Sequence, residues 1–235
     1  MLIIKFGEEE WINKLKDGEI FMRPISDYRK LEIEQKKKGQ GDKYDGKFHI
    51  KQDMQSNMFG IQTKIKELEL DFDGDEKNLI GCFYKMYMYT TRLKLISEDD
   101  EKKLFLYEFT EEEKKEFAEW GDTALLILQR PFLEKIGEKF KERQIEAYGR
   151  NVKYYNCNAP DINYIKDYSE GNENRLFWKD DYFINQNEFR IITAMQADEG
   201  RVIFNIGDIS DISETRKIKE LLNEGIIVPI YKNIN

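Results

Sequence analysis

The chain has few of the residues that bind transition metals or form disulfides. Its 235 residues include two cysteines, Cys82 and Cys157, which lie far apart in the sequence, and one histidine, His49. A structural zinc site takes four nitrogen or sulfur ligands, so we expect no site of that kind and no bound metal. Nucleophilic Cys–His chemistry is disfavoured for the same shortage of partners. Cys82 lies in an apolar run, which favours a small core residue.

Long apolar runs are also missing. No segment reaches the ~20 residues that a membrane-spanning helix needs, and the opening stretch MLIIKFGEEEW lacks the apolar region of a secretory signal. With four prolines, 40% hydrophobic and 36% charged residues, the composition is that of a folded chain and not of a disordered one. We therefore expect a cytoplasmic protein with reduced thiols and no membrane association.

Positive charge is in deficit. The chain has 38 basic and 46 acidic side chains, for a net charge of -8. Acidic residues concentrate at 67–76 and 98–101. Duplex DNA is bound by neutralising its phosphates with Lys and Arg, so we expect weak duplex binding at physiological salt. The charge leaves a second interpretation open, in which an acidic surface of the protein competes with nucleic acid for a basic partner.

Short strands and helices alternate along the chain without a repeating βαβ period. Strands are expected at 19–25, 79–91, 124–129, 151–158 and 182–193. Helices are expected at 26–38 with Ser26 as the cap, at 110–120 capped by Thr110, and at 131–143 with Pro131 in the first turn.

The sequence contains no internal repeat, linker or composition break. It predicts a single α+β domain over residues 1–235, with a mostly antiparallel, split central sheet flanked by helices. The strands at 19–25, 79–91, 124–129 and 182–193 are expected to share one core, with helix 131–143 packed on it. The Lys/Glu runs at 111–116 and 134–143 are interpreted as solvated helix faces.

A loop with the sequence GQGDKYDG, residues 39–46, has three glycines and two aspartates. It lacks the GK[ST] sequence of a phosphate-binding loop and the glutamate of an EF-hand. We interpret it as a flexible rim from which Asp42 and Tyr44 reach a ligand. His49, just beyond it, is expected to be an ordinary strand residue.

The stretch YFINQNEFRIIT, residues 182–193, carries an unusual polar face. If it is a strand, Gln186, Glu188 and Arg190 point to the same side, because side chains alternate between the two faces of a strand. Two interpretations are open. The three side chains form an internal ion pair with a polar neighbour, or they form a catalytic strand.

Three short motifs, in chain order, resemble those of ADP-ribosyltransferases of the Arg–Ser–Glu class. That class has an arginine on an early strand, a Ser/Thr-rich strand after an aromatic residue, and a Gln/Glu-x-Glu strand. The corresponding residues here are Arg23 in IFMRPI, Tyr89, Thr90 and Thr91 in MYMYTT, and Gln186 and Glu188 in QNE. The middle motif reads Tyr-Thr-Thr where the class has Ser-Thr-Ser.

The resemblance implies NAD as substrate. Cleavage of its N-glycosidic bond passes through an oxocarbenium-like ribose, which a carboxylate at Glu188 would stabilise, with Gln186 near the incoming nucleophile. Arg23 would hold the phosphates, and the 89–91 segment would contribute Tyr89, Thr90 and Thr91 to binding of the dinucleotide. The acceptor would be a macromolecule.

A wider pattern is similar to a loosely defined set of uncharacterised bacterial and phage proteins associated with the ADP-ribosyltransferase-like fold. It includes DGEIFMRPISDYRKLE, ALLILQRPFLEKI and the late EFRI. It leaves open whether the chain is an enzyme, because sites are grafted on folds and are lost from them. The alternative is a catalytically idle interaction protein of a mobile element, such as a phage-encoded anti-defence inhibitor that binds and blocks a bacterial immune complex.

Overall fold

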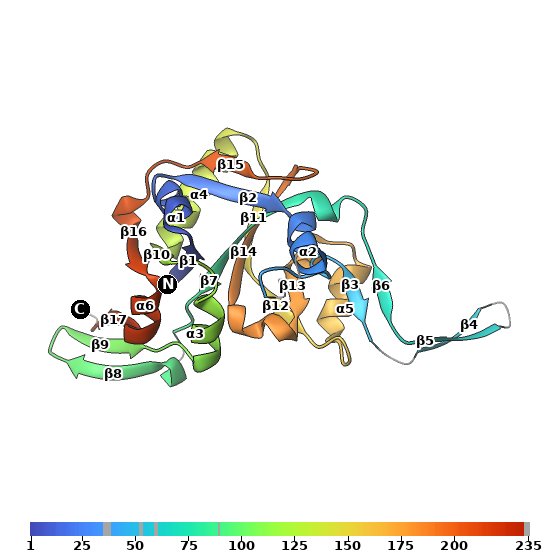
Figure 1. The fold of residues 1–235 in the computed structure, drawn as a ribbon, viewed down its shortest axis with the longest axis horizontal. Coiled ribbons are helices and arrows are strands. Elements are labelled where there is room, and N and C mark those ends of the chain that lie inside the picture. The colour runs from blue at the N-terminus through green and yellow to red at the C-terminus, as the bar shows by residue number, and fades with distance from the viewer. Residues whose placement is uncertain (35–38, 52–53, 59–60, 89, 233–235) are drawn as a thin grey trace. The chain divides into compact units, whose positions relative to one another are not determined.

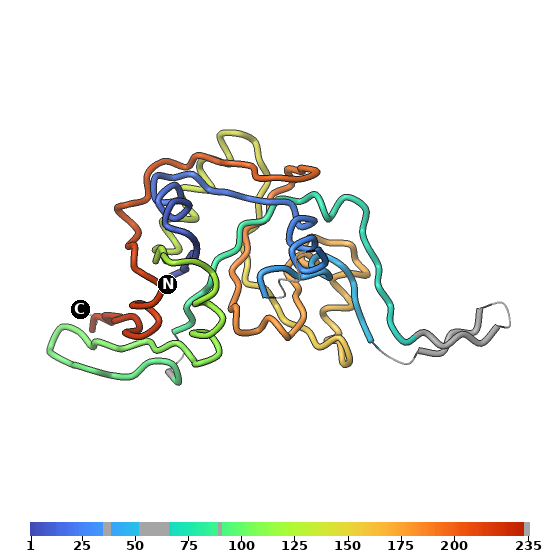
Figure 2. Tube along the Cα trace, in the orientation of Figure 1, coloured from blue at the N-terminus to red at the C-terminus, as the bar shows by residue number. Residues whose placement is uncertain are grey.

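The structure is a computed structural model that describes residues 1–34, 39–51, 54–58, 61–88 and 90–232. The chain divides into two compact units. Unit 1 comprises Met1–Ile20, Phe83–Lys139 and Asn205–Asn235, and unit 2 comprises Phe21–Cys82 and Phe140–Phe204. Figure 2 traces the chain through both; within unit 2, its early segment, blue to cyan, and its later segment, yellow to orange, come together.

Unit 1 is built on an antiparallel sheet around β10 (Thr123–Leu128). On one side β10 pairs over its whole length with β1 (Leu2–Gly7), and on the other side it pairs with β16 (Ser213–Lys217). β1 also pairs with the end of β7 (Asn78–Lys85). The TALLIL sequence of β10 is buried from Thr123 to Ile127, as expected for a strand covered on both faces.

Four helices belong wholly or mainly to unit 1: α1 (Glu9–Lys16), α3 (Glu111–Phe117), α4 (Gln129–Glu142) and α6 (Ile218–Glu224). The core beneath α3 is aromatic: Phe6 stacks on Phe117 with ring centroids 4.7 Å apart. A second, three-stranded sheet in this unit has the order β17 (Ile226–Tyr231), β9 (Lys102–Tyr107), β8 (Leu93–Glu98).

Unit 2 contains the strand of the QNEFR motif, β14 (Glu188–Gln196). It pairs antiparallel with β11 (Ala147–Asn151) and, on its other side, with β7. The start of β7 pairs in turn with β2 (Glu19–Pro24), where Arg23 lies opposite Ile80. β15 (Val202–Asn205) pairs with β2.

Smaller elements complete unit 2 (Figure 1): α2 (Ile25–Ile33), α5 (Ile162–Ser169), the antiparallel pairs β3 (Phe48–Ile50) with β6 (Leu68–Leu70) and β4 (Met54–Met58) with β5 (Ile61–Ile65), and the parallel pair β12 (Lys153–Tyr155) with β13 (Trp178–Asp180). An aromatic cluster of Phe48, Tyr155, Tyr164, Tyr168 and Trp178 packs between β3, α5 and the β12–β13 pair. Unit 2 also has the short 3-10 helices η1 (Asp75–Lys77), η3 (Glu173–Phe177) and η4 (Asp181–Gln186), whereas η2 (Thr90–Arg92) and η5 (Ser210–Ile212) belong to unit 1.

The α+β class with mainly antiparallel pairing is confirmed. The helix capped by Thr110 is confirmed too, and its cap is a full capping box with Glu113. The expectation of a single domain over 1–235 stays a prediction. Among the described residues, no helix combines the length and the apolar character needed to cross a membrane.

Several predicted boundaries are wrong. The strand at 79–91 ends at Lys85, and Thr90–Arg92 is a 3-10 turn. The strand at 151–158 is replaced by β11 and β12, with Val152 between them. The residue that caps α2 is Pro24, whose fixed φ suits the turn into a helix, so Ser26 lies inside the helix. The 111–116 run is not wholly solvated, because its Glu113 is 1% exposed.

Candidate functional site

The residues just before β14 determine the directions in which the QNEFR side chains point. The prediction of one strand over 182–193 is wrong, because Asp181–Gln186 form the 3-10 helix η4 and β14 begins at Glu188. Between them Asn187 has the left-handed conformation (φ 39°), which asparagine tolerates better than most residues. The strand alternation that would align Gln186 with Glu188 is therefore absent.

Gln186 and Glu188 nevertheless meet, and the group that joins them is Lys179. The Lys179 ammonium donates to Oε1 of Gln186 and to Oε2 of Glu188, both at 2.9 Å. Gln186 uses its amide group to donate to the carbonyl of Gly39 at 2.6 Å. A lysine on β13 therefore brings together side chains that the backbone alone would separate.

Arg190 is the central cation of the same group. Its guanidinium donates to both carboxylate oxygens of Asp45, at 2.7 and 2.9 Å. It also donates from Nε to Oε1 of Glu188 at 2.6 Å and from Nη1 to the carbonyl of Leu176 at 2.9 Å. The side chain is 0% exposed, so the carboxylates of Asp45 and Glu188, and not water, balance its charge.

The four charged groups, Lys179, Arg190, Asp45 and Glu188, form what we call the buried ion network. They carry two positive and two negative charges, and each residue is at most 9% exposed. Burial raises the pKa of the Glu188 carboxyl, but the charges of Arg190 and Lys179 outweigh burial and hold that pKa well below its usual value. Glu188 is therefore ionised and fully paired within the chain.

The 39–46 loop is part of this network and not a rim. Asp42 and Asp45 are each 2% exposed, which contradicts the expectation that Asp42 reaches outward to a ligand. The loop passes α2 closely: a Cβ at Gly41 would lie 2.5 Å from the backbone nitrogen of Glu32. Glycine at this position permits the approach that delivers Asp45 to Arg190.

Asp42 lies beside the buried ion network as a fifth ionisable group. Burial and the negative charge of Asp45 raise its pKa to about 7, against the opposing charge of Lys179. With two cations already matched by Asp45 and Glu188, an ionised Asp42 would leave one unbalanced negative charge. The raised pKa of Asp42 follows first from its burial and then from that excess of negative charge.

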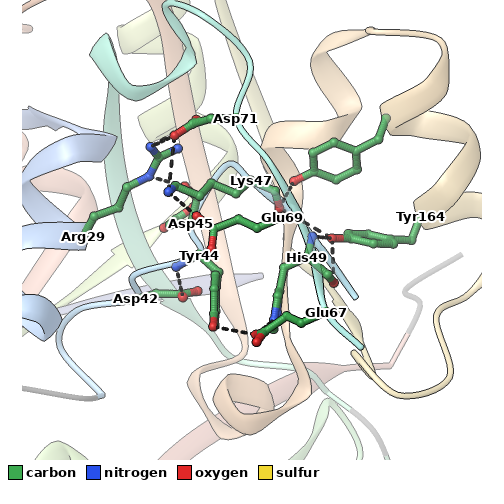
Figure 3. A network of polar contacts seen from close by, with 11 residues as sticks. Arg29, Asp42, Tyr44, Asp45, Lys47, His49, Glu67, Glu69, Asp71 and Tyr164 are labelled. Atoms are coloured by element: carbon green, nitrogen blue, oxygen red, sulfur yellow. Dashed lines mark hydrogen bonds and ion pairs between the residues drawn. The ribbon is translucent and has the colours of Figure 1, made fainter. Parts of the chain in front are cut away.

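A second polar layer surrounds the loop (Figure 3). Arg29 on α2 donates to the carbonyl of Asp45 at 2.8 Å and to the carboxylate of Asp71, while Lys47 pairs with Glu69. Tyr44 and His49 stack with ring centroids 3.6 Å apart, and both hydrogen-bond to Oε1 of Glu67. Tyr44 therefore faces a neighbour within unit 2.

Arg23, the predicted phosphate ligand, is half-buried on β2 in the same unit. It makes no ion pair with the residues that the structure describes. Burial raises the pKa of the nearby Tyr28 hydroxyl, and the charges of Arg23 and Arg190 act in the opposite direction. The charge of Arg23 therefore acts on the Tyr28 hydroxyl, as do the charges of Glu188 and Arg190 in the buried ion network.

The Tyr89, Thr90 and Thr91 motif belongs to unit 1, whereas Glu188 belongs to unit 2. Thr91 is exposed on η2 in unit 1. The side chain of Thr90 and the whole of Tyr89 lie outside the described residues. The dinucleotide-binding roles of these three residues stay predictions.

Sequence reasoning missed Lys179 and Asp45, the two partners that close the network. The sequence carries no signal for Asp45, because it lies 145 positions from Arg190 and only the fold brings the two together. It carries none for Lys179 either, because the partners of Lys179 depend on the 3-10 turn that follows it.

Comparison with known proteins places no relative beside this chain: no protein-family model, curated protein or solved structure matches it.

Proposed function

We propose that this protein acts by binding another protein, and that the Gln186, Glu188 and Arg190 group is a structural core of unit 2. The observation that carries the proposal is the closure of Glu188. A carboxylate that stabilises a ribosyl cation must direct its charge at the substrate. Here both oxygens lie within 2.9 Å of cations of the chain, and the residue is 4% exposed.

Unit 1 presents a surface suited to binding. In the β17–β9–β8 sheet, directly paired residues point to the same face. The pair Ile226 and Tyr107 is buried, so the neighbouring pair Ile227 and Leu106 points to the opposite side. We call that side the outer face; its apolar residues on β17 and β9 are Ile227, Pro229, Tyr231, Leu104 and Leu106.

Along β17 the outer face is apolar where a surface is normally polar, and Lys102 on β9 and Lys94 on β8 lie beside it on the same face. Ile227 is 60% exposed and Tyr231 is 66% exposed, with Pro229 exposed between them. Clustered apolar side chains of this kind mark interaction surfaces more often than isolated ones do. Tyrosine also supplies a large contact area with little loss of conformational entropy, which favours protein partners.

The partner is expected to contact side chains and not to extend the sheet. β17 lies at an edge of its sheet, where a strand of another chain would add. Pro229 has no N–H to donate in that position, and proline at an edge opposes such pairing. The most concrete form of the partner is a bacterial immune complex blocked by a protein of a mobile element, a role that suits the small size and the acidic, Lys-, Ile- and Asn-rich composition of the chain.

NAD-dependent transfer of ADP-ribose to a macromolecule is the alternative. One geometric observation favours it: Gln186 and Glu188 contact the same ammonium group, and Arg23 belongs to the same unit. Catalysis would require Lys179 to release Glu188 when the dinucleotide binds. The two functions differ in whether NAD is consumed.

The decisive experiment places a photo-crosslinking amino acid at Ile227 and, as a control, at Ile162. Ile162 is 73% exposed on α5, so the two positions are matched in residue type and exposure. Crosslinking in cells should yield a defined protein adduct from position 227 only. The purified adduct partner should then bind Ile227→Lys at least about tenfold more weakly than wild type, while Ile162→Lys binds normally.

Labelled NAD is offered to the wild-type protein in parallel, with and without cell extract. Absence of a 227-specific adduct, or equal binding by both lysine variants, contradicts the binding proposal. Release of nicotinamide by the wild-type protein supports the transferase alternative.

A further inference from the structure

Three side chains of metal-ligating type meet in unit 2, outside the buried ion network. They are His49 on β3, Cys157 shortly after β12, and Asp180 at the end of β13. Their ligand atoms lie within 4.8 Å of one another. The parallel pairing of β12 with β13, which places Tyr155 opposite Asp180, brings the cysteine and the aspartate to the same end of the pair.

The ring of His49 is held in one orientation. It is 1% exposed, stacks on Tyr44 with an interplanar angle of 7°, and has its Nε2 2.7 Å from Oε1 of Glu67. An ionised carboxylate only accepts hydrogen bonds, so Nε2 is the donor, and in the neutral ring Nδ1 carries the lone pair.

Nδ1 of His49 is buried and has no hydrogen-bond partner among the described residues. An unpaired buried nitrogen costs free energy, and native structures rarely leave one unexplained. The arrangement matches metal-binding histidines, in which the nitrogen that does not bind the metal donates to a carboxylate. The open lone pair is therefore the one that a ligated ion would use.

Cys157 and Asp180 supply the remaining donors. Oδ1 of Asp180 accepts from the backbone N–H of Tyr182 at 2.9 Å, which orients the carboxylate. The Cys157 thiol is hydrogen-bonded to Asp180. A bound divalent cation would stabilise the thiolate and release the thiol proton.

We propose that His49 Nδ1, Cys157 Sγ and a carboxylate oxygen of Asp180 bind a divalent transition metal of the zinc class, with the fourth position taken by water. Nitrogen, sulfur and oxygen donors together suit zinc and cobalt better than calcium or magnesium. Donor atoms around a tetrahedral zinc are about 3.3–3.8 Å apart, given the usual zinc–ligand distances. The three donor atoms lie within 4.8 Å of one another, so a closure of at most about 1–1.5 Å brings them to these separations.

This inference goes beyond the proposed binding function and concerns unit 2. It differs from the sequence expectation of no metal, which required four nitrogen or sulfur ligands of a structural site. Three protein ligands with an open position are the arrangement of zinc sites that activate water. The cluster cannot be predicted from the sequence, because its three residues come from separate segments of the chain.

Cobalt chloride is the probe, added to metal-free protein under reducing conditions. The wild type should bind one Co²⁺ per chain and show the visible bands of tetrahedral cobalt with a thiolate-to-cobalt charge-transfer band in the near ultraviolet. Cys157→Ser should lose the charge-transfer band. Cys82→Ser should keep it, which is the matched control because these are the two cysteines of the chain.

Glu67→Gln tests the outer carboxylate. It should weaken cobalt binding about 10- to 100-fold without removing the charge-transfer band, which is the usual effect of losing a partner of a metal-bound histidine. Circular dichroism of the metal-free variants checks that each is folded.

Two results overturn the proposal: absence of a charge-transfer band in the wild type, or a band of the same intensity in folded Cys157→Ser. If Cys157→Ser does not fold, the presence or absence of the charge-transfer band in the wild type decides whether the site exists. Zinc should slow alkylation of Cys157 relative to Cys82, measured by peptide mass, and equal rates with and without zinc refute the site.

Discussion

Arg190 and Asp45, 145 positions apart in the sequence, form a two-point ion pair in the interior of unit 2, with nitrogen–oxygen distances of 2.7 and 2.9 Å. The side chains are 0% and 2% exposed. Bidentate geometry of this kind is available to arginine and not to lysine. The pair ties the 39–46 loop to β14 and makes the loop's position depend on the strand.

Replacing Arg190 with methionine should destabilise the protein strongly. The change keeps the side-chain length but leaves Asp45 and Glu188 without their shared cation, and breaking a buried pair in this way costs about 3–5 kcal/mol. Urea unfolding measures the loss. Arg130→Met is the control, because Arg130 pairs with Glu134 on the surface with 90% of its side chain exposed, and that change should cost at most about 1 kcal/mol.

Glu188→Gln separates the structural role from the catalytic one. If the network is structural, removing this charge leaves Lys179 in excess, so the variant should lose about 3–5 kcal/mol of stability. If the strand is catalytic, the same change should lower turnover by about 10² to 10³ with little change in Tm. We expect the first outcome, with no turnover in either protein.

Thermal unfolding and NAD consumption, measured on the same samples, distinguish the two. Glu173→Gln is the control within unit 2, since Glu173 pairs with Arg150 at the surface. Its Tm should stay close to that of the wild type. A Glu188→Gln variant with unchanged Tm argues against the structural role.

Asp42 should make stability fall as the pH rises towards neutrality. Its pKa is raised from 3.8 to about 7 in the folded state, so between about pH 4 and 7 the folded chain binds more protons than the unfolded chain. Stability from this group is present at low pH and is lost as the pH rises through that window. Asp42→Asn removes the titration and should stabilise the protein above pH 7, by up to about 4 kcal/mol for a shift of about three units.

Urea unfolding of the wild type and Asp42→Asn at pH 4, 6 and 8 provides the measurement. The difference between the two proteins should vanish near pH 4 and grow towards pH 8. Asp100→Asn, at an exposed position, should show no such trend. A constant difference at all three pH values would rule out titration of Asp42 as the cause.

The capping box of α3 should contribute measurably to the stability of unit 1. Thr110 Oγ1 accepts from the backbone N–H of Glu113 at 3.2 Å, and the Glu113 carboxylate accepts from the backbone N–H of Thr110 at 2.9 Å. Thr110→Ala should cost about 1 kcal/mol, the usual scale for removing an N-cap. Thr91→Ala, at an exposed position in the same unit, is the control and should change the free energy of unfolding by less than about 0.5 kcal/mol.

Local chemistry made several elements predictable from the sequence. Thr110 followed three residues later by a glutamate predicts a cap, and an apolar run followed by Pro131 predicts a buried strand that turns into a helix. Both are confirmed by α3 and by the β10–α4 sequence. These signals act over a few residues, so no knowledge of the rest of the chain is needed.

The QNEFR side chains show where local reasoning fails. The alternation rule assumes an extended backbone, but Asp180 caps a 3-10 helix that runs through Gln186, and Asn187 turns left-handed before the strand begins. Whether Glu188 and Arg190 are solvated or buried also depends on what covers β14. That depends on segments distant in the sequence.

The sequence by itself therefore determined the α+β class, the Thr110 cap of α3, the buried strand β10 followed by α4, and the proximity of Glu188 to Arg190. Only the tertiary structure decided that Asp45 and Lys179 complete a buried ion network, and that His49, Cys157 and Asp180 meet. The physical reason is range: hydrogen bonds within turns and helices join near neighbours, whereas pairing of buried charges and ligands depends on which distant segments the hydrophobic core brings into contact.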